Sequence, residues 1–265
     1  MTLRDFVPPI IIKALKPLRR PHEYASYHQA VADCEGYENP DIADAVLTKT
    51  RLYRDALKNG SIHPISSSVM TFAALTVLGC SNPYIIDFGG ALGAHYFEVR
   101  SLVPKTCLLH WIVVDTPEMV QRGTEFIDDE LSFASDLTAA RKAFNDHVDL
   151  IHSAGTLQYV PDPEAMLRTL LSQGADYVLL RRMALSKTET RITIQKHMLS
   201  WSPGPTPNGF KDRQLGVPRT ALAKHIFDQA IYESGYKIIA TFADESGLFY
   251  GAEREIGGAL ILRRI

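Results

Sequence analysis

Hydrophobic positions in the first third of the chain recur with the period of a helix. In the segment Asp41–Lys58 apolar side chains return every three or four residues, and Asn59 and Gly60 follow as a stop signal. A second and more apolar segment, Ser66–Leu78, fits a buried helix. We therefore expect residues 22–80 to be helical.

The pattern changes after residue 80 to short apolar runs that alternate with amphipathic segments. We expect the runs to be strands, at Tyr84–Asp87, Leu108–Asp115, Val148–His152, Tyr177–Leu180, Tyr236–Phe242 and Gly258–Arg263. The helices between them are expected near Ala94–Leu102, from Pro117 onward, at Pro163–Ser172 and at Leu222–Ser234. Such alternation is typical of a doubly wound α/β sheet, which binds ligands at the carboxyl ends of its strands.

On this pattern the chain divides into two parts. We expect residues 1–80 to form a helical N-terminal arm and cap, and residues 81–265 to form the domain that holds the α/β sheet. No apolar run approaches the ~18 residues that a membrane-spanning helix needs. Residues 6–20 combine apolar and basic side chains and could contact a membrane surface. Packing of this arm on its own protein, or on a partner subunit in a homodimer, is the favoured interpretation.

The composition is typical of a globular protein with a sizeable core. The 265 residues are 46% hydrophobic and 22% charged, and 28 basic against 30 acidic residues give a net charge of −2 and a pI near 6.5. A nucleic-acid-binding protein usually has a basic excess, so no nucleic-acid partner is expected. Cys34, Cys80 and Cys107 are far apart and form no CxxC pair, so we expect no disulfide framework, no metal site and a cytoplasmic location.

The candidate ligand site is a glycine-rich turn after the first expected strand. That strand ends in Asp87, and Gly89, Gly90 and Gly93 follow before the next helix. Glycines at such a turn let the backbone approach a ligand closely and direct amide N–H groups at it. We therefore assign these four residues to cofactor binding.

Two common nucleotide-binding motifs do not fit this turn. The dinucleotide fingerprint G-x-G-x-x-G starting at Gly89 needs glycines where the chain has Ala91 and Ala94. A phosphate-binding P-loop needs Gly-Lys followed by Ser or Thr, which is absent from this stretch of sequence. The pattern Asp-x-Gly-x-x-x-Gly suits instead a ligand with a cationic ammonium and a ribose. An NAD(P)-dependent oxidoreductase is therefore the less favoured alternative.

The turn resembles the first motif of the class I S-adenosylmethionine (SAM)-dependent methyltransferases. Asp87, Gly89 and Gly93 match it, and Ala91 replaces its middle glycine, a change that is tolerated where the backbone is not left-handed. The resemblance implies SAM as cofactor, with Asp87 near its methionyl ammonium. It also implies a Rossmann-like fold, in which a mostly parallel sheet has an antiparallel last strand, here beside a helical N-terminal cap.

The same resemblance gives three further residues cofactor roles. Asp115 ends the second expected strand, where the family has an acid that binds both ribose hydroxyls; the alternative is an N-cap for the helix that starts at Pro117. Asp136 lies in a segment that resembles the one that meets the adenine amino group, and an ordinary loop aspartate is the competing interpretation. Ser153, at the end of the fourth strand, would face the methionine end of the cofactor.

A closer resemblance is to a subgroup of bacterial methyltransferases that are often encoded beside surface-polysaccharide genes. Its motifs appear in order at Asp87–Gly93, Trp111–Asp115, Leu157–Pro163 and Arg182. The resemblance implies a role in polysaccharide biosynthesis. The implied acceptor is a small polar molecule, with a sugar or glycan precursor as the candidate.

Residues on the acceptor side are expected at strand ends. An oxygen acceptor needs a base, for which His95, His152 and His197 are candidates, although a structural histidine is the favoured alternative for each. Tyr159 and Arg182 are the preferred acceptor-side residues, against an aromatic core contact and a salt bridge at the sheet edge. Arg182 could hold a phosphate or carboxylate on the acceptor.

The segment Trp201–Phe210 is rich in Pro and Gly and is expected to be a lid over the acceptor or a surface connection. Residues and resemblance together predict a cytoplasmic SAM-dependent methyltransferase that methylates oxygen or nitrogen of a small acceptor. A catalytically inactive subunit with the methyltransferase fold is a second alternative, because no base is obvious.

Overall fold

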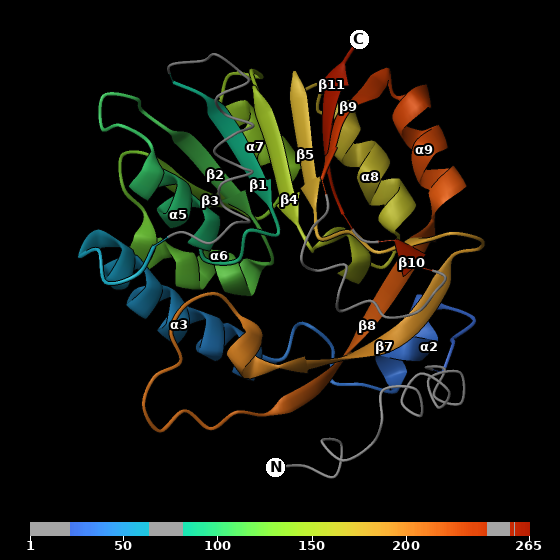
Figure 1. Cartoon of the computed structure of the whole chain (residues 1–265), viewed down its shortest axis with the longest axis horizontal. Coiled ribbons are helices and arrows are strands. Elements are labelled where there is room, and N and C mark those ends of the chain that lie inside the picture. The colour runs from blue at the N-terminus through green and yellow to red at the C-terminus, as the bar shows by residue number, and fades with distance from the viewer. Residues whose placement is uncertain (1–21, 64–81, 243–254, 257) are drawn as a thin grey trace.

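A seven-stranded sheet forms the centre of the protein (Figure 1). The computed structural model describes residues 22–63, 82–242, 255–256 and 258–265. In spatial order the strands are β3 (Leu131–Ala134), β2 (His110–Val114), β1 (Tyr84–Phe88), β4 (Leu150–Ala154), β5 (Tyr177–Arg181), β11 (Ala259–Arg264) and β9 (Tyr236–Phe242). β1 to β5 are parallel, whereas β11 is antiparallel to both β5 and β9. The predicted doubly wound, mostly parallel sheet with an antiparallel last strand is confirmed.

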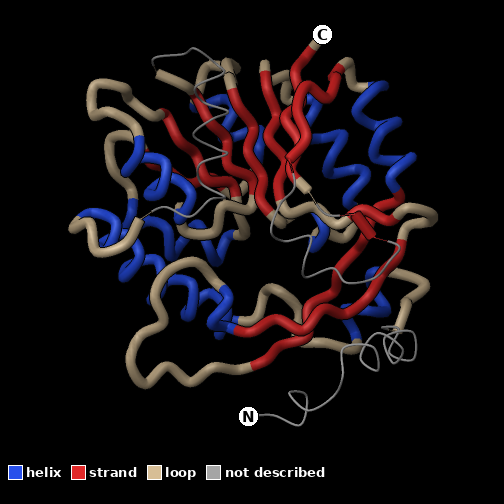
Figure 2. Tube along the Cα trace, in the orientation of Figure 1, coloured by secondary structure: helices blue, strands red, loops and turns tan. Residues whose placement is uncertain are grey.

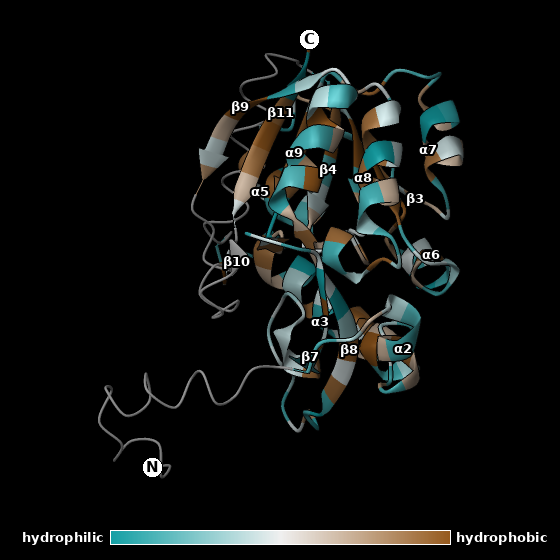
Figure 3. Cartoon of the chain, turned by 90° about the vertical axis from the view of Figure 1, so that its right-hand side faces the viewer, coloured by the Kyte–Doolittle hydropathy of each residue, from teal (hydrophilic) through white to brown (hydrophobic). Residues whose placement is uncertain are grey.

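Helices cover both faces of the sheet around β1, where successive residues point to opposite sides. Ile85 packs in the core on one face and Ile86 in the core on the other. The helices on the first face are α3 (Pro40–Lys58), α5 (Ala94–Leu102) and α6 (Pro117–Gly123), and those on the second are α7 (Leu137–Ala143), α8 (Pro163–Ser172) and α9 (Lys224–Glu233). Figure 2 shows the strands in red with the blue helices around them. In Figure 3 the strands β9 and β11 are mostly hydrophobic, while α9 turns hydrophilic residues outward.

The bounds of several elements agree with the sequence pattern where capping residues mark them. Asp162 accepts a hydrogen bond from the backbone N–H of Ala165 at 2.9 Å and so caps α8, which starts at Pro163. Asn39 caps α3 in the same way through the N–H of Asp41. The expected helix Ser66–Leu78 and the arm residues 6–20 lie outside the described residues. Within the described part of the chain, no helix combines the length and apolar character needed to cross a membrane.

A second sheet, which the sequence pattern did not predict, lies beyond the carboxyl ends of β4 and β5 (Figure 1). In spatial order its strands are β10 (Glu255–Ile256), β6 (Leu185–Ser186), β8 (Gln214–Ala223) and β7 (Arg191–Met198). β7 and β8 form a long antiparallel hairpin, whose connection holds the short 3₁₀ helix η5 (Leu199–Trp201). β8 also contacts the 3₁₀ helix η4 (Leu157–Tyr159), which follows β4. The hairpin therefore stands over the edge of the main sheet where ligands are expected.

The helix expected from Leu222 needs a correction. Leu222 and Ala223 are the last residues of β8, and α9 starts at Lys224. Gly216 and Pro218 interrupt the apolar alternation of β8, so its sequence does not read as a strand. Pairing with β7 stabilises the strand all the same.

The N-terminal segment packs on the hairpin and on the main domain. The short helix α2 (Tyr27–Ala32) contacts β7 and β8, and Tyr24 N–H donates to the carbonyl of Ile192 at 2.9 Å. α3 packs on α5, where the Tyr53 hydroxyl donates to Glu98. The buried Lys49 ammonium donates to the carbonyl of Ser200 at 2.6 Å and so ties α3 to η5.

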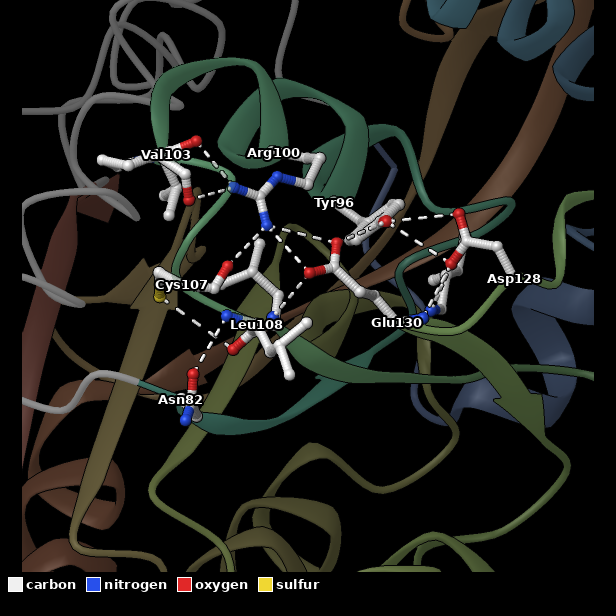
Figure 4. Close-up of polar contacts among 11 residues, drawn as sticks. Asn82, Tyr96, Arg100, Val103, Cys107, Leu108, Asp128 and Glu130 are labelled. Atoms are coloured by element: carbon white, nitrogen blue, oxygen red, sulfur yellow. Dashed lines mark hydrogen bonds and ion pairs between the residues drawn. The ribbon is translucent and has the colours of Figure 1, made fainter.

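A polar network fixes α5 at the amino-terminal edge of the sheet (Figure 4). The Arg100 guanidinium donates to the carbonyls of Val103 and Cys107 at 2.6 and 2.8 Å and to Glu130 at 2.9 Å. Glu130 in turn accepts from the Tyr96 hydroxyl at 3.1 Å. Since α5 starts at the glycine-rich turn, this network helps to hold the turn in place from the far end of the helix.

Candidate functional site

The glycine-rich turn between β1 and α5 has no room for side chains at two of its positions. A Cβ added to Gly89 would lie 2.0 Å from Oγ1 of Thr156, and one added to Gly90 would lie 2.4 Å from Oδ2 of Asp87. Gly89 and Gly93 also have left-handed backbones, with φ of 69° and 82°. Gly89 and Gly90 therefore let the turn pack closely on the end of β1 and on Thr156, which follows β4, while Gly93 lies beside Leu131 of β3.

The condition under which alanine fits easily at position 91 is not met, because the backbone of Ala91 is left-handed, with φ of 51°. This conformation costs an alanine about 1–2 kcal/mol. Its N–H donates to Oδ2 of Asp115 at 2.8 Å, and this bond holds the residue in the turn. The turn therefore accepts alanine in place of the middle glycine, and the backbone of Ala91 is strained as a result.

Replacing Ala91 with glycine is expected to raise the free energy of unfolding by about 0.5–1 kcal/mol, since the lost strain exceeds the added chain entropy. Urea denaturation measures this change. Ala94→Gly is the matched control in the first turn of α5, where it should lower stability by about 0.5–1 kcal/mol. Equal losses for both variants would show that the left-handed backbone at Ala91 is not strained.

A buried carboxylate and two imidazoles lie beneath this turn. Asp87 and His152 have no exposed surface, and they are opposite each other in the β1–β4 register. Nδ1 of His152 lies 2.7 Å from Oδ1 of Asp87, and Nδ1 of His95 lies 3.4 Å from its Oδ2. Because an ionised carboxylate only accepts hydrogen bonds, we assign the proton to Nδ1 of His152. Both predicted catalytic histidines thus contact the predicted cofactor-binding aspartate.

The electrostatics of this trio leave a buried negative charge. Burial raises the pKa of Asp87, but the charges and hydrogen bonds of His152 and His95 outweigh it and hold the pKa well below its usual range. Burial lowers the pKa of His152 to about 4, against the opposing attraction of Asp87. Near neutral pH the carboxylate is therefore ionised beside a neutral His152, and a cation bound at the turn would be favoured.

The same three side chains have ligand types that a metal ion could use, with ligand atoms all within 4.8 Å of one another. Their present spacing includes a carboxylate–imidazole distance of 2.7 Å, which is that of a hydrogen bond. The geometry is accounted for by these hydrogen bonds, and the sequence expectation of no metal stays a prediction.

Asp115 meets the glycine-rich turn from the end of β2. Its Oδ2 accepts from the N–H of Ala91 at 2.8 Å and its Oδ1 from the N–H of Thr116 at 2.7 Å. Burial raises the pKa of Asp115, partly offset by these two hydrogen bonds. The N-cap of α6 is Thr116, whose hydroxyl accepts from Met119, so the alternative of a capping role for Asp115 is corrected.

The other two predicted cofactor residues differ in their surroundings. Asp136 is exposed and caps α7, where its Oδ1 accepts from the N–H of Ala139 at 2.8 Å. Ser153 is buried at the carboxyl end of β4, beside Phe88 of β1. Its hydroxyl has no hydrogen-bond partner among the described residues and lines a narrow cavity next to Arg182. Ser153 can therefore offer a buried donor, whereas Asp136 already uses one oxygen in a cap.

Of the two residues expected on the acceptor side, Arg182 directly follows β5 as predicted, whereas Tyr159 lies in η4, beyond the end of β4. Arg182 follows β5 with a left-handed φ of 49°, and its guanidinium donates to the carbonyl of Ala154 at 2.7 Å. The Tyr159 hydroxyl donates to Oε1 of Gln195 on β7 at 3.0 Å. The backbone carbonyl of Tyr159 accepts from the hydroxyl of Tyr27. Tyr159 thus joins the main sheet to the hairpin.

Three further side chains near Tyr159 were not assigned from the sequence. The ring of Tyr37 lies 5.0 Å from that of Tyr159, between centroids, and Gln195 accepts the hydrogen bond from the Tyr159 hydroxyl. Tyr27 approaches the same residue from α2. The alternation along β7 is the one sequence signal that places Gln195 and His197 on a common face.

Comparisons with known proteins give structural likeness only. No protein-family model matches the chain, and no curated protein was found that is similar to it. Solved structures that resemble it include the CcbJ methyltransferase from Streptomyces caelestis, with 9% identity over 76% of this chain and 90% of that chain, and a TM-score of 0.49. The N-terminal domain of EvdMO1 in the presence of SAH and D-fucose is 12% identical over 76% and 84% of the two chains, with a TM-score of 0.48. The amino pentose methyltransferase CalS10 from Micromonospora echinaspora is 11% identical over 75% and 90%, with a TM-score of 0.48.

Proposed function

We propose that this protein is a SAM-dependent methyltransferase. The observation that carries the proposal is the buried, ionised Asp87 under a glycine-rich turn that Asp115 meets from the neighbouring strand. A ligand with a cationic group and a vicinal diol complements two carboxylates at one turn. SAM has both groups, and the position at the carboxyl ends of β1 and β2 is where an open α/β sheet binds its ligands.

The described residues divide between holding the cofactor and holding the acceptor. The turn at Gly89–Gly93 would receive the cofactor, with Asp115 on its ribose and Ser153 toward its methionine end. When bound, SAM supplies a methyl group on a cationic sulfur. The chain supplies the positioning of an acceptor against it, which can account for about 7–11 kcal/mol of the barrier. The β7–β8 hairpin contacts η4 and Arg182 donates to the carbonyl of Ala154 at this edge, so these segments would form the acceptor side.

For the acceptor we propose a small polar molecule, with a sugar or glycan precursor as the candidate. Tyr159, Gln195 and Arg182 offer hydroxyl, amide and guanidinium groups next to aromatic rings. Small-molecule sites commonly combine such rings with a few polar groups. Arg182 would hold an acidic group on the acceptor.

Calorimetric titration of the purified protein with SAM and with S-adenosylhomocysteine tests the cofactor. Saturable binding of both is expected. Binding of NAD(P) in their place would restore the oxidoreductase alternative. Binding of SAM with no methyl transfer to any acceptor pool would favour an inactive subunit.

Replacing Asp115 with alanine is expected to weaken SAM binding by about 1–3 kcal/mol through the lost charge-assisted hydrogen bonds. The same calorimetry measures it. Asp176→Ala is the matched control: it removes an exposed aspartate that pairs with Arg264, before β5, and leaves SAM affinity unchanged. An unaltered affinity in a folded Asp115 variant would remove Asp115 from the cofactor site.

A further inference from the structure

Four aromatic side chains from four separate segments meet on the acceptor side of the sheet. Between ring centroids, Tyr37 lies 5.0 Å from Tyr159 and 5.8 Å from His197, and His197 lies 5.7 Å from Trp201. Tyr37 comes from the connection between α2 and α3, Tyr159 from η4, His197 from β7 and Trp201 from η5. We call Tyr37, Tyr159, His197 and Trp201 the aromatic cluster.

Contacts connect this cluster to the glycine-rich turn. The Thr156 hydroxyl donates to the carbonyl of Gly89 at 3.2 Å, and next to it the guanidinium of Arg182 lies over Gly155, 3.2 Å from where a Cβ would be. Within the cluster, the N–H of Tyr159 donates to the carbonyl of the same Thr156 at 2.8 Å. The aromatic cluster therefore lies beside the edge where the methyl group would be presented.

Two residues of the aromatic cluster are exposed. Trp201 is 51% exposed and Tyr37 is 39% exposed, whereas most large apolar side chains in the described domain are buried. Exposed aromatic rings grouped around a few polar side chains are typical of a ligand site. The C–H faces of a sugar ring can pack on such rings while its hydroxyls reach the polar groups.

His197 differs from the other two candidate bases in having no part in the Asp87 trio. His95 and His152 each direct Nδ1 at Asp87, and His152 has no exposed surface. Burial lowers the pKa of His197, and the positive charge of Arg182 lowers it further, against an opposing effect of Asp212. The positive charge of Lys49 on α3 is one of the causes that lower the pKa of Asp212. A neutral imidazole near pH 7 can accept a proton.

We propose that His197 is the general base of an O-methyltransferase, and that Trp201 and Tyr37 hold the hydroxylated ring of its acceptor. This inference rests on the proposed function. The acceptor oxygen would form a bond to the methyl carbon as the carbon–sulfur bond breaks and its electron pair stays on sulfur, which becomes a neutral thioether. The hydroxyl proton passes to the imidazole of His197. The acceptor atom is thereby oxygen and not nitrogen.

The fluorescence of Trp201 reports on His197 without any acceptor. A protonated imidazole quenches a neighbouring indole. The only other tryptophan in the sequence, Trp111, lies 6.4 Å from His152 between ring centroids, and burial lowers the pKa of His152 to about 4. The titration is therefore followed only down to about pH 5, where His152 stays neutral. We expect the emission of the wild-type protein to fall as the pH is lowered below 6.5, and His197→Gln and Trp201→Phe to abolish that change. A wild-type transition above pH 7 would overturn the proposal, because the histidine would then be protonated at neutral pH.

Methyl transfer tests the role itself. Tritium from methyl-labelled SAM is followed into a small-molecule extract of the source cells, and the product is analysed for the methylated atom. We expect His197→Gln to lower the rate about 10²–10⁴-fold without changing SAM affinity, and the methyl group to be on oxygen. His225→Gln, at an exposed position on α9, is the matched control and should keep the wild-type rate.

The outcomes separate this inference from the proposed function. Lack of SAM binding, or lack of any transfer by the wild-type protein, would defeat the proposed function and the base with it. Transfer by the wild type that persists within a few-fold in His197→Gln would defeat the base alone. A methyl group found on nitrogen would do the same.

Discussion

Replacing Asp87 with asparagine is expected to weaken SAM binding by about ten- to 150-fold and to lower the stability of the folded protein at neutral pH by less than this change in binding free energy. Charge-assisted hydrogen bonds contribute about 1.5–3 kcal/mol, which corresponds to that change in affinity. The amide has the shape of the carboxyl group, so its oxygen can accept from Nδ1 of His152 and its NH₂ can donate to Nδ1 of His95. Only the negative charge is lost.

Two effects act on the charge of Asp87. Burial raises the pKa of Asp87, and the charges and hydrogen bonds of His152 and His95 lower it by more, so the folded protein favours the ionised form. Asparagine can keep both hydrogen bonds and loses only the charge. A loss of SAM affinity larger than the loss of stability is therefore expected if the charge acts on the cofactor.

Calorimetry with SAM and urea denaturation measure the two effects. Asp55→Asn makes the same change of charge on the exposed side of α3, where Asp55 pairs with Arg54, and should alter neither quantity much. SAM affinity that is undiminished in a folded Asp87→Asn protein would show that the buried charge does not act on the cofactor.

The main sheet could be predicted because its signals are local. Each strand is a short apolar run, and prolines and capping residues mark the starts of α3, α6 and α8. The second sheet could not be predicted in this way. Gly216 and Pro218 make the sequence of β8 unlike that of a strand, and the strand is stabilised by its pairing with β7. The left-handed backbone of Ala91 is set by the turn as a whole, and it could not be predicted from an alanine in the sequence.

The sequence indicated which residues belong to the candidate site, but it did not indicate which of them contact one another. Asp87, His95 and His152 were each singled out, but their grouping depends on the β1–β4 register that sets Asp87 opposite His152. The aromatic cluster needs still more distant pairings, since Tyr37 and Trp201 meet His197 only when the hairpin and the N-terminal segment are in place. Such contacts are set by topology and not by local sequence.

Replacing His152 with leucine is expected to lower the free energy of unfolding by about 3–5 kcal/mol, because it leaves the buried Asp87 carboxylate without its closest donor. Urea denaturation measures the loss. Adding Asp87→Asn to this variant should restore a large part of it, since the group that needs the donor is then neutral. Losses that simply add would show that His152 and Asp87 do not interact.

The same variant should also change how stability depends on pH. The pKa of His152 falls from 6.5 to about 4 in the folded protein, so between these values the unfolded chain binds a proton that the folded protein does not. Stability therefore decreases as the pH is lowered through this window, and His152→Leu should remove that part of the slope. Asp87, with a lowered pKa, acts in a separate window: its contribution is present above 3.8 and is lost only at lower pH. A slope between pH 6.5 and 4 that is unchanged in the His152 variant would mean that other groups account for it and that His152 is not held neutral by burial.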